Sequence, residues 1–207
     1  MTPKSKFWDK IADKYAKSPI SDPEAYETKL AKTAEFLRPA MRMLELGCGT
    51  GGTALHHAAN VAHVHAVDIS ARMIELADEK RRKAGVSNVR FSVGEVDAFT
   101  PDDGEVYDVI LAMSLLHLLE DRDVALAKIR SLLQPGDIFV SSTMCMGDDH
   151  KWFKFVGPLG KALGLFPTVR MFTTQELRTS IEAAGFDIVH RWKPGRGKAS
   201  FFIAQAR

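Results

Sequence analysis

The sequence predicts an α/β fold: a doubly wound, mostly parallel sheet of seven strands with helices on both faces. The first observation behind this is the alternation of short apolar runs with amphipathic stretches from residue 41 onward. The second is a glycine-rich turn at residues 47–52, directly after an apolar run and before a helical stretch. The third is a closing pair of strands, which predicts an antiparallel C-terminal strand.

Two helices are expected before the first strand. Apolar and aromatic residues recur at helical spacing over residues 4–17 and again over 24–37, with prolines between the two stretches. Tyr15 lies in the first stretch and Tyr26 in the second. We expect residues 1–40 to form a helical cap on a single domain that spans residues 1–207.

The central part of the chain repeats the strand-then-helix pattern. Ser70 is placed to cap one of its helices and Gly85 to end that helix. A continuously apolar run such as 106–112 is typical of a strand covered on both faces. Strands are expected at 43–46, 62–67, 89–93, 106–112 and 138–142, and helices at 53–60, 71–84 and 124–133.

Residues 147–172 interrupt this rhythm, because apolar residues are mixed there with glycines and prolines. We expect a lid insertion after the fifth strand. A helix to about residue 184 follows, capped by Thr173 or Thr174, with Glu176 at the capping-box position relative to Thr173. Strands at 186–192 and 200–204 then form a basic hairpin, for which we expect a solvated turn, with contact to an anionic substrate or membrane surface as the alternative.

Composition narrows the class of protein. The chain has 45% hydrophobic and 26% charged residues and a formal net charge of +2, which gives no general electrostatic reason to expect nucleic acid as a partner. No stretch approaches the ~18 apolar residues of a membrane span, and the first residues lack the apolar run of a signal peptide. The two cysteines have no metal-ligand spacing. We therefore expect a cytoplasmic protein without stable membrane insertion.

The glycine turn carries the first functional signal. Gly47, Gly49 and Gly52 satisfy the G-x-G-x-x-G pattern, and Asp68 follows Gly47 by 21 residues, at the end of the second expected strand. An acidic residue at such a position binds ribose hydroxyls. This pattern alone does not separate a nicotinamide cofactor from another adenosine ligand.

A more specific signal than the glycine pattern comes from four segments in a fixed order, together with Glu45 before the glycines and the terminal hairpin. They are LELGCGTG at 44–51, VDIS at 67–70, YDVI at 107–110 and LLQPG at 132–136. This ordered set resembles class I (Rossmann-like) S-adenosylmethionine-dependent methyltransferases of the small-molecule type, over roughly residues 41–206. The resemblance implies S-adenosylmethionine as cofactor and S-adenosylhomocysteine as product.

The resemblance also implies roles for individual residues. Gly47, Cys48, Gly49 and Gly51 would pass beside the methionine part of the cofactor, and Glu45 would orient the loop or the cofactor's amino group. Asp68 would hold both ribose hydroxyls through its paired acceptor oxygens. Ile69 would pack on the adenine, and Ala112 would face the cofactor through its backbone. For the adenine amino group we favour Glu95 with the Val96 N–H and keep Asp97 as the alternative.

Three further side chains are candidates near the acceptor. The hydroxyl of Tyr15 or Tyr26 would reach the cofactor carboxylate or the acceptor, and simple ring packing is the alternative for both. His117 is a candidate general base, since imidazole titrates near neutral pH. For His117 we favour a buried ring bonded to backbone. Four histidines lie close together in the sequence, at positions 56, 57, 63 and 65. Their spacing does not direct the four side chains to one point, so no metal is expected.

The function that follows is methyl transfer from S-adenosylmethionine to a small metabolite by in-line displacement, with lipophilic molecules among the candidate acceptors. One alternative is an NAD-dependent oxidoreductase, which accounts for the glycines and Asp68 but not for Glu45 or the hairpin. The other is a non-catalytic S-adenosylmethionine-binding protein of the same fold. The acceptor atom and the oligomeric state are not encoded in these motifs.

Overall fold

The computed structural model describes residues 3–102, 104–149, 167 and 169–207. These residues form two compact units, Met1–Leu111 and Ala112–Arg207, and each unit is described by itself. The expected lid at 147–172 lies mostly outside the described residues. The expectation of a single domain over 1–207 stays a prediction.

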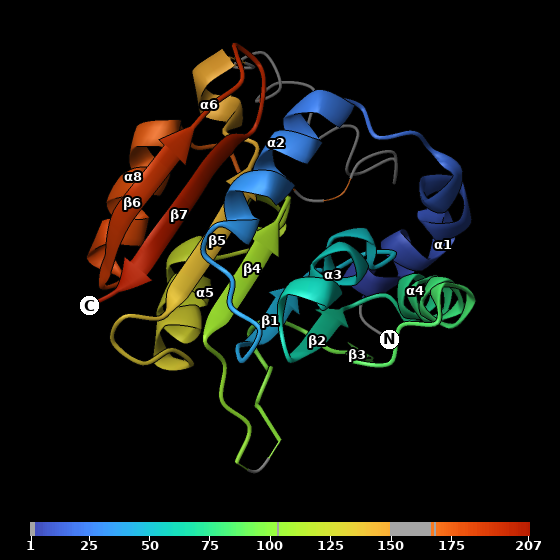
Figure 1. Cartoon of the computed structure of the whole chain (residues 1–207). Helices are drawn as coiled ribbons and strands as arrows, with labels where there is room; N and C mark the ends of the chain where they lie inside the picture. The colour runs from blue at the N-terminus through green and yellow to red at the C-terminus, as the bar shows by residue number, and fades with distance from the viewer. Residues whose placement is uncertain (1–2, 103, 150–166, 168) are drawn as a thin grey trace. The chain divides into compact units, whose positions relative to one another are not determined.

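The seven-stranded sheet confirms the predicted fold class, with helices on both faces (Figure 1). Strand order is β3-β2-β1-β4-β5-β7-β6. The pairs β1/β2, β1/β4 and β2/β3 are parallel, whereas β7 is antiparallel to both β5 and β6. The strands are β1 (Arg42–Leu46), β2 (His63–Asp68), β3 (Val89–Val93), β4 (Val109–Met113), β5 (Ile138–Thr143), β6 (Phe186–Trp192) and β7 (Ser200–Ala206).

The predicted start of the fourth strand is wrong by three residues. Val106 is exposed, and Tyr107 turns its buried hydroxyl toward His65 Nδ1, at 2.9 Å. Asp108 Oδ2 accepts a hydrogen bond of 2.7 Å from the N–H of Arg42, the first residue of β1. These side-chain contacts hold residues 106–108 in a loop, and β4 begins only at Val109.

Helices of the first unit lie close to the predicted ranges. They are α1 (Pro3–Lys17), α2 (Pro23–Ala34), α3 (Gly52–His57) with the 3-10 turn η1 (Ala58–Asn60), and α4 (Ala71–Ala84). Helix α1 packs against α4, and α2 packs against α3. Ser70 caps α4 by accepting a hydrogen bond of 3.1 Å from Met73 N, and Gly85 ends that helix in the left-handed conformation, both as predicted.

The second unit contains η2 (Leu116–Leu118), α5 (Arg122–Ser131), α6 (Met146–Asp149) and α8 (Thr174–Ala183). Helix α5 begins two residues earlier than predicted because Asp121 caps it, accepting hydrogen bonds from the N–H groups of Asp123 and Val124. The predicted capping box is confirmed. Thr173 Oγ1 accepts from Glu176 N at 3.1 Å, and Glu176 Oε2 accepts from Thr173 N at 2.7 Å.

Removal of this cap should lower the stability of the protein. Thr173→Ala removes the side-chain acceptor at the start of α8, so the free energy of unfolding should fall by about 1 kcal/mol. Thr28→Ala is the matched control, because the exposed Thr28 hydroxyl only donates to a carbonyl of its own helix. Urea denaturation of both variants gives the comparison, and equal losses would contradict the role of the cap.

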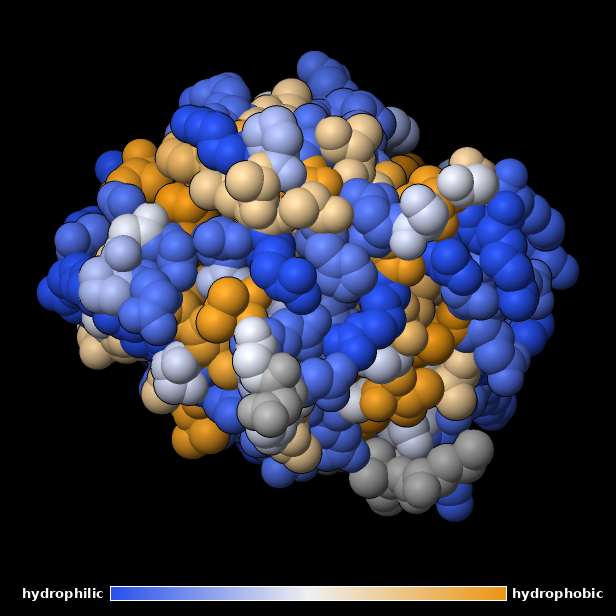
Figure 2. Space-filling model, turned by 60° about the horizontal axis from the view of Figure 1, so that its bottom comes forward, coloured by the Kyte–Doolittle hydropathy of each residue, from blue (hydrophilic) through white to orange (hydrophobic). Residues whose placement is uncertain are grey.

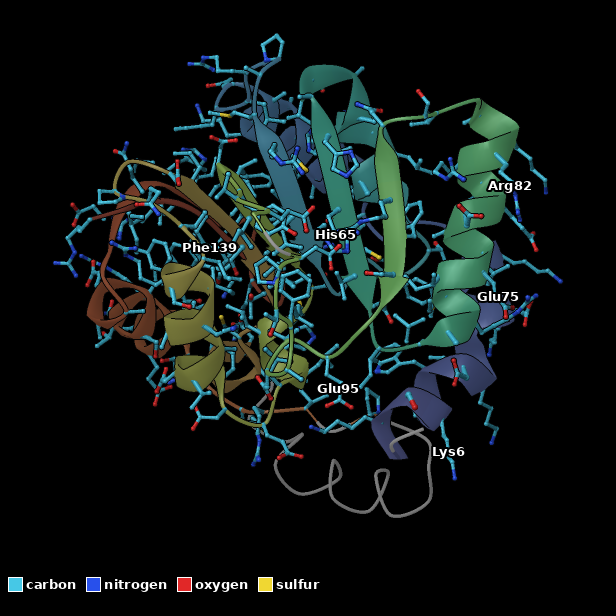
Figure 3. The ribbon with its side chains drawn as sticks, turned by 90° about the horizontal axis from the view of Figure 1, so that it is seen from below. Lys6, His65, Glu75, Arg82, Glu95 and Phe139 are labelled. Carbon is cyan, nitrogen blue, oxygen red and sulfur yellow. The ribbon has the colours of Figure 1, made fainter. Side chains whose placement is uncertain are left out.

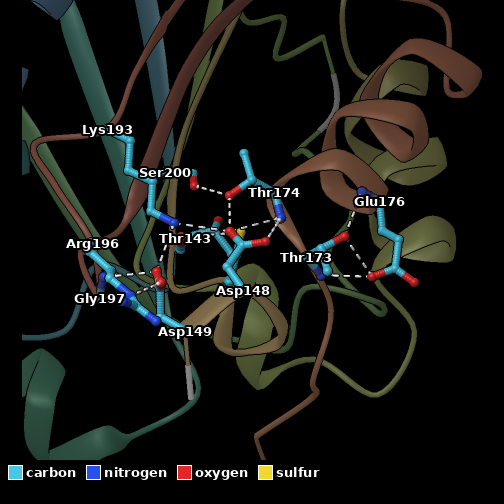
Figure 4. Close-up of polar contacts among 11 residues, drawn as sticks. Thr143, Asp148, Asp149, Thr173, Thr174, Glu176, Lys193, Arg196, Gly197 and Ser200 are labelled. Atoms are coloured by element: carbon cyan, nitrogen blue, oxygen red, sulfur yellow. Dashed lines mark hydrogen bonds and ion pairs between the residues drawn. The ribbon is translucent and has the colours of Figure 1, made fainter. Parts of the chain in front are cut away.

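Two carboxylates of α6 engage the basic hairpin between β6 and β7 (Figure 4). Asp148 Oδ2 accepts from Lys193 Nζ at 2.9 Å, and Asp149 accepts from Gly197 N at 2.8 Å and pairs with Arg196 at 3.0 Å. Two of the hairpin's cations therefore already have carboxylate partners. Arg196 stays largely in solvent, as expected for a turn.

Hydrophilic residues predominate on the face drawn in Figure 2, where apolar residues gather in small separate patches. Scattered apolar side chains of this kind are ordinary on a protein surface. Within the described part of the chain, no helix combines the length and the apolar character that crossing a membrane would require.

Candidate functional site

The glycine loop joins the end of β1 to α3 in the first unit. Gly47, Gly49 and Gly51 have φ values of +68°, +53° and +74°. Gly51 is more tightly enclosed than Gly49, since a Cβ there would lie 2.6 Å from Phe91 Cζ and 3.0 Å from the Cβ of Ala77. Only glycine combines this left-handed backbone with such close neighbours. Gly52, by contrast, is the first residue of α3.

Asp68, the last residue of β2, is bound to this loop. Its Oδ2 accepts a hydrogen bond of 2.8 Å from Gly49 N, and its Oδ1 accepts one of 2.9 Å from Ser70 N. Burial raises the pKa of Asp68, and these N–H groups oppose that shift. Each carboxylate oxygen has a further acceptor site. Asp68 therefore positions the loop and retains capacity to bind hydroxyl groups.

Glu45 is an acceptor with an unfilled position. Its side chain is buried, with 2% of the residue exposed, and the backbone N–H of Ala54 donates to it. Its Oε2 has no hydrogen-bond partner among the described residues. Burial, opposed by the Ala54 N–H and aided by the charge of Asp68, raises the pKa of Glu45 to about 8. A buried acceptor of this kind fits a cationic or N–H donor from a ligand.

A pocket of about 220 Å³ lies at the ends of β2 and β3 in the same unit. Two predicted adenine-site residues, Ile69 and Glu95, are both in its lining. Val96 is buried, whereas Asp97 is exposed and outside the lining. The structure thus brings Ile69 and Glu95 together, and the choice of Glu95 over Asp97 for the adenine amino group stays a prediction.

Both tyrosines of the N-terminal helices lie at the glycine loop. Tyr15 is half-exposed, and its Cε1 is 3.9 Å from the position that a Cβ on Gly49 would take. Partial burial and the carboxylates of Asp68 and Glu45 raise the pKa of Tyr15. The Tyr26 hydroxyl is within 3.1 Å of Thr53 Oγ1 in the first turn of α3.

Cys48 and the two candidates of the second unit are buried. The Cys48 N–H donates to Val67 O at 3.0 Å, which ties the loop to β2. Ala112, in β4, is fully buried. His117, in η2, is 9% exposed; burial lowers its pKa to about 4, and its Nδ1 has no partner among the described residues. The ring is buried as expected, but the expected backbone bond is not made at Nδ1.

The other histidines have separate surroundings. His65 lies between Tyr107 and Ser92, with hydrogen bonds of 2.9 and 2.7 Å. His57 is fully buried, and its ring meets that of His56 edge-on. The described residues contain no group of three or more His, Cys, Asp or Glu side chains that would hold a metal ion.

Sequence reasoning missed the contribution of α1 to this pocket, whose lining includes Ser5 and Asp9. Asp9 Oδ1 accepts hydrogen bonds from Ser70 Oγ at 2.7 Å and from Arg72 N at 3.1 Å. No sequence signal separates Asp9 from the other polar residues of an amphipathic helix, which ordinarily face solvent.

Comparison with known proteins gives a family match. A family model described as a methyltransferase domain matches residues 37–185. Among sequence relatives, the uncharacterised methyltransferase YcgJ of Bacillus subtilis is 30% identical over 133 residues, which cover 64% of this chain and 51% of YcgJ. The ubiquinone/menaquinone biosynthesis C-methyltransferase UbiE of Idiomarina loihiensis is 27% identical, covering 74% of this chain and 69% of UbiE.

Solved structures share the fold. The crystal structure of YcgJ superposes with a TM-score of 0.67 at 24% identity, covering 80% of this chain and 72% of that one. Phosphoethanolamine N-methyltransferase 2 of Haemonchus contortus, in complex with S-adenosyl-L-methionine, superposes with a TM-score of 0.77 at 17% identity, covering 100% and 60%. The chain spans about half the length of YcgJ and smaller shares, 28% and 5%, of two other relatives that it matches.

Proposed function

This chain belongs to the methyltransferase domain family, and on that premise we propose that it transfers a methyl group from S-adenosylmethionine to a small-molecule acceptor, with S-adenosylhomocysteine as product. The observation that carries the proposal is the buried Oε2 of Glu45, which no described residue contacts by a hydrogen bond, beside a left-handed glycine loop. A dinucleotide pyrophosphate is anionic and offers no donor to this carboxylate. The amino group of a methionine moiety does.

In this proposal, different residues of the first unit bind different parts of the cofactor. Glu45 holds the amino group, and the backbone of Gly47, Cys48, Gly49 and Gly51 lies along the amino-acid end. Asp68 binds the ribose hydroxyls with the acceptor capacity left by its two N–H donors. Ile69, Glu95 and the Val96 N–H receive the adenine, which is supported by the pocket that Ile69 and Glu95 line.

Chemistry in this class demands little acid–base catalysis from the protein. When bound, S-adenosylmethionine supplies an electrophilic methyl group on its sulfonium. The chain's part is to bind and orient the reactants in line and to exclude water, and orientation of this kind contributes several kcal/mol. His117 is neutral at pH 7, given its lowered pKa. We propose it as a hydrogen-bond acceptor for the methyl acceptor's proton, in a role secondary to orientation.

The acceptor is proposed only as a class. The names of the relatives include an N-methyltransferase and a C-methyltransferase, so no acceptor atom is assigned. Both cysteines are unpaired, which agrees with the reducing cytoplasm that we propose as its location. A small metabolite remains the proposed partner, in preference to nucleic acid.

Equilibrium binding tests the proposal. Isothermal titration of the ligand-free protein with S-adenosylhomocysteine should show one binding event, and titration with NADH should show none. Incubation with labelled S-adenosylmethionine and a metabolite extract should then produce a labelled small molecule. Binding of NADH alone would overturn the cofactor assignment, whereas cofactor binding without any transfer would favour a non-catalytic protein of the same fold.

Asp68 provides a prediction on the same site. Asp68→Ala removes the acceptor for two hydroxyls and frees Gly49 N and Ser70 N, so the affinity for S-adenosylhomocysteine should fall about 10- to 100-fold. Asp187→Ala is the control, since Asp187 is an exposed residue of β6 whose ion pair with Arg207 is weak. Calorimetry on both variants measures the affinity for S-adenosylhomocysteine. An affinity unchanged by Asp68→Ala would remove Asp68 from the site.

A further inference from the structure

Asp9 joins helix α1 to the start of α4, beside the proposed cofactor site. Its Oδ1 accepts two hydrogen bonds at the start of α4, from the hydroxyl of Ser70 and from the backbone N–H of Arg72. Ser70 is fully buried. If Asp9 were removed, the Ser70 hydroxyl would be a buried donor without this acceptor, which is an unfavourable state.

Ser70 connects Asp9 to the glycine loop. Its N–H donates to Asp68 Oδ1 at 2.9 Å, and Asp68 Oδ2 accepts from Gly49 N at 2.8 Å. A continuous series of hydrogen bonds thus runs from α1 through the start of α4 to the loop. Every bond in this series lies within the first unit.

Tyr15 is the part of α1 that reaches the loop. Asp9 and Tyr15 are six residues apart, about 9 Å along the helix axis and on different sides of it. Ala12, one turn from each, is fully buried. Contacts of Asp9 with α4 therefore contribute to the position and the rotation of α1, and with them to the place of the Tyr15 ring near Gly49.

A second contact between the same helices serves as a contrast. Asp13 pairs with the side chain of Arg72 at 2.7 Å, and both side chains are well exposed. Exposed ion pairs contribute little because solvent screens them. Figure 3 shows α1, which carries Lys6, beside α4, which carries Glu75, where these contacts form.

We propose that Asp9 is a positioning residue that latches α1 to the start of α4 and thereby holds Tyr15 over the glycine loop, where it covers the bound cofactor. The inference rests on the proposed function, because it assigns the purpose of the latch to cofactor binding. Asp9 acts through α1 and Tyr15 rather than by direct contact with the cofactor.

The first test combines three variants with two measurements. Asp9→Ala should weaken binding of S-adenosylhomocysteine about tenfold and speed hydrogen exchange of the α1 amides, while β1 to β3 keep their protection. Asp9→Asn keeps an oxygen in the Oδ1 position and should restore both properties to near those of the wild type. Asp13→Ala is the matched control and should leave both unchanged.

A double-mutant cycle tests the route through Tyr15. Tyr15→Ala should weaken binding. Adding Asp9→Ala to Tyr15→Ala should weaken it little further, because Asp9 then has no Tyr15 ring to position. Additive losses, or a tenfold loss without faster exchange in α1, would overturn the proposal in favour of direct contact. Wild-type affinity in Asp9→Ala would overturn it as well. Failure of the wild-type protein to bind S-adenosylhomocysteine would instead refute the proposed function.

Discussion

Between pH 4.5 and about 8 the free protein should lose stability as the pH rises, because of Glu45. Burial raises its pKa from 4.5 to about 8 in the folded state. In this interval the folded protein therefore holds a proton that the unfolded chain has released, and the free energy of unfolding falls with pH. The loss should reach a few kcal/mol by pH 8.

Glu45→Gln removes this proton, so the variant should be more stable than the wild type at pH 8 and should lack that part of the pH dependence. Urea denaturation across the interval measures it. Glu79→Gln is the control, since Glu79 is an exposed residue of α4. Equal slopes for wild type and Glu45→Gln would refute the assignment.

Cofactor binding should respond to pH in the opposite direction. An ammonium group beside Glu45 favours the carboxylate, so binding at pH 7 should release a proton and the affinity should rise toward pH 8. Calorimetry in buffers of different ionisation enthalpy counts this proton. Glu45→Gln should abolish the release and weaken binding, and a release that persists in the variant would locate the proton elsewhere.

Gly51→Ala should have the second large effect. The φ of +74° strains any other residue, and the new Cβ would meet Phe91 Cζ at 2.6 Å and the Cβ of Ala77 at 3.0 Å. Strain and overpacking together should cost about 2–5 kcal/mol of stability. Denaturant unfolding measures the loss, and cofactor affinity should fall as the loop shifts.

Gly85→Ala separates these two causes. Gly85 has a φ of +66° but nothing within 4 Å of the Cβ position, so its replacement should cost only the backbone strain, about 1–2 kcal/mol. Phe91→Leu combined with Gly51→Ala should recover part of the steric loss. Equal losses at the two glycines would show that the contact with Phe91 is relieved without cost.

Features that depend on neighbours in sequence were predictable. The cap at Ser70, the helix end at Gly85 and the Thr173–Glu176 capping box all follow from backbone geometry within a few residues, and the structure confirms them. The parallel pairing of β1 with β2 and β4, and of β2 with β3, likewise follows from a repeated strand–helix pattern, whose crossovers favour parallel neighbours. The family was predictable because its motifs are short and ordered along the chain.

The sequence by itself thus determined the fold class, the helix caps at Ser70, Gly85 and Thr173, and the family of this protein. Tertiary structure alone decided that Asp108 delays the start of β4, that Glu45 Oε2 has no partner among the described residues and that Asp9 binds the start of α4. The physical reason is the separation along the chain between the residues that interact. A cap or a turn is set by adjacent peptide units, whereas burial and side-chain pairing join residues about sixty positions apart, which no local pattern encodes.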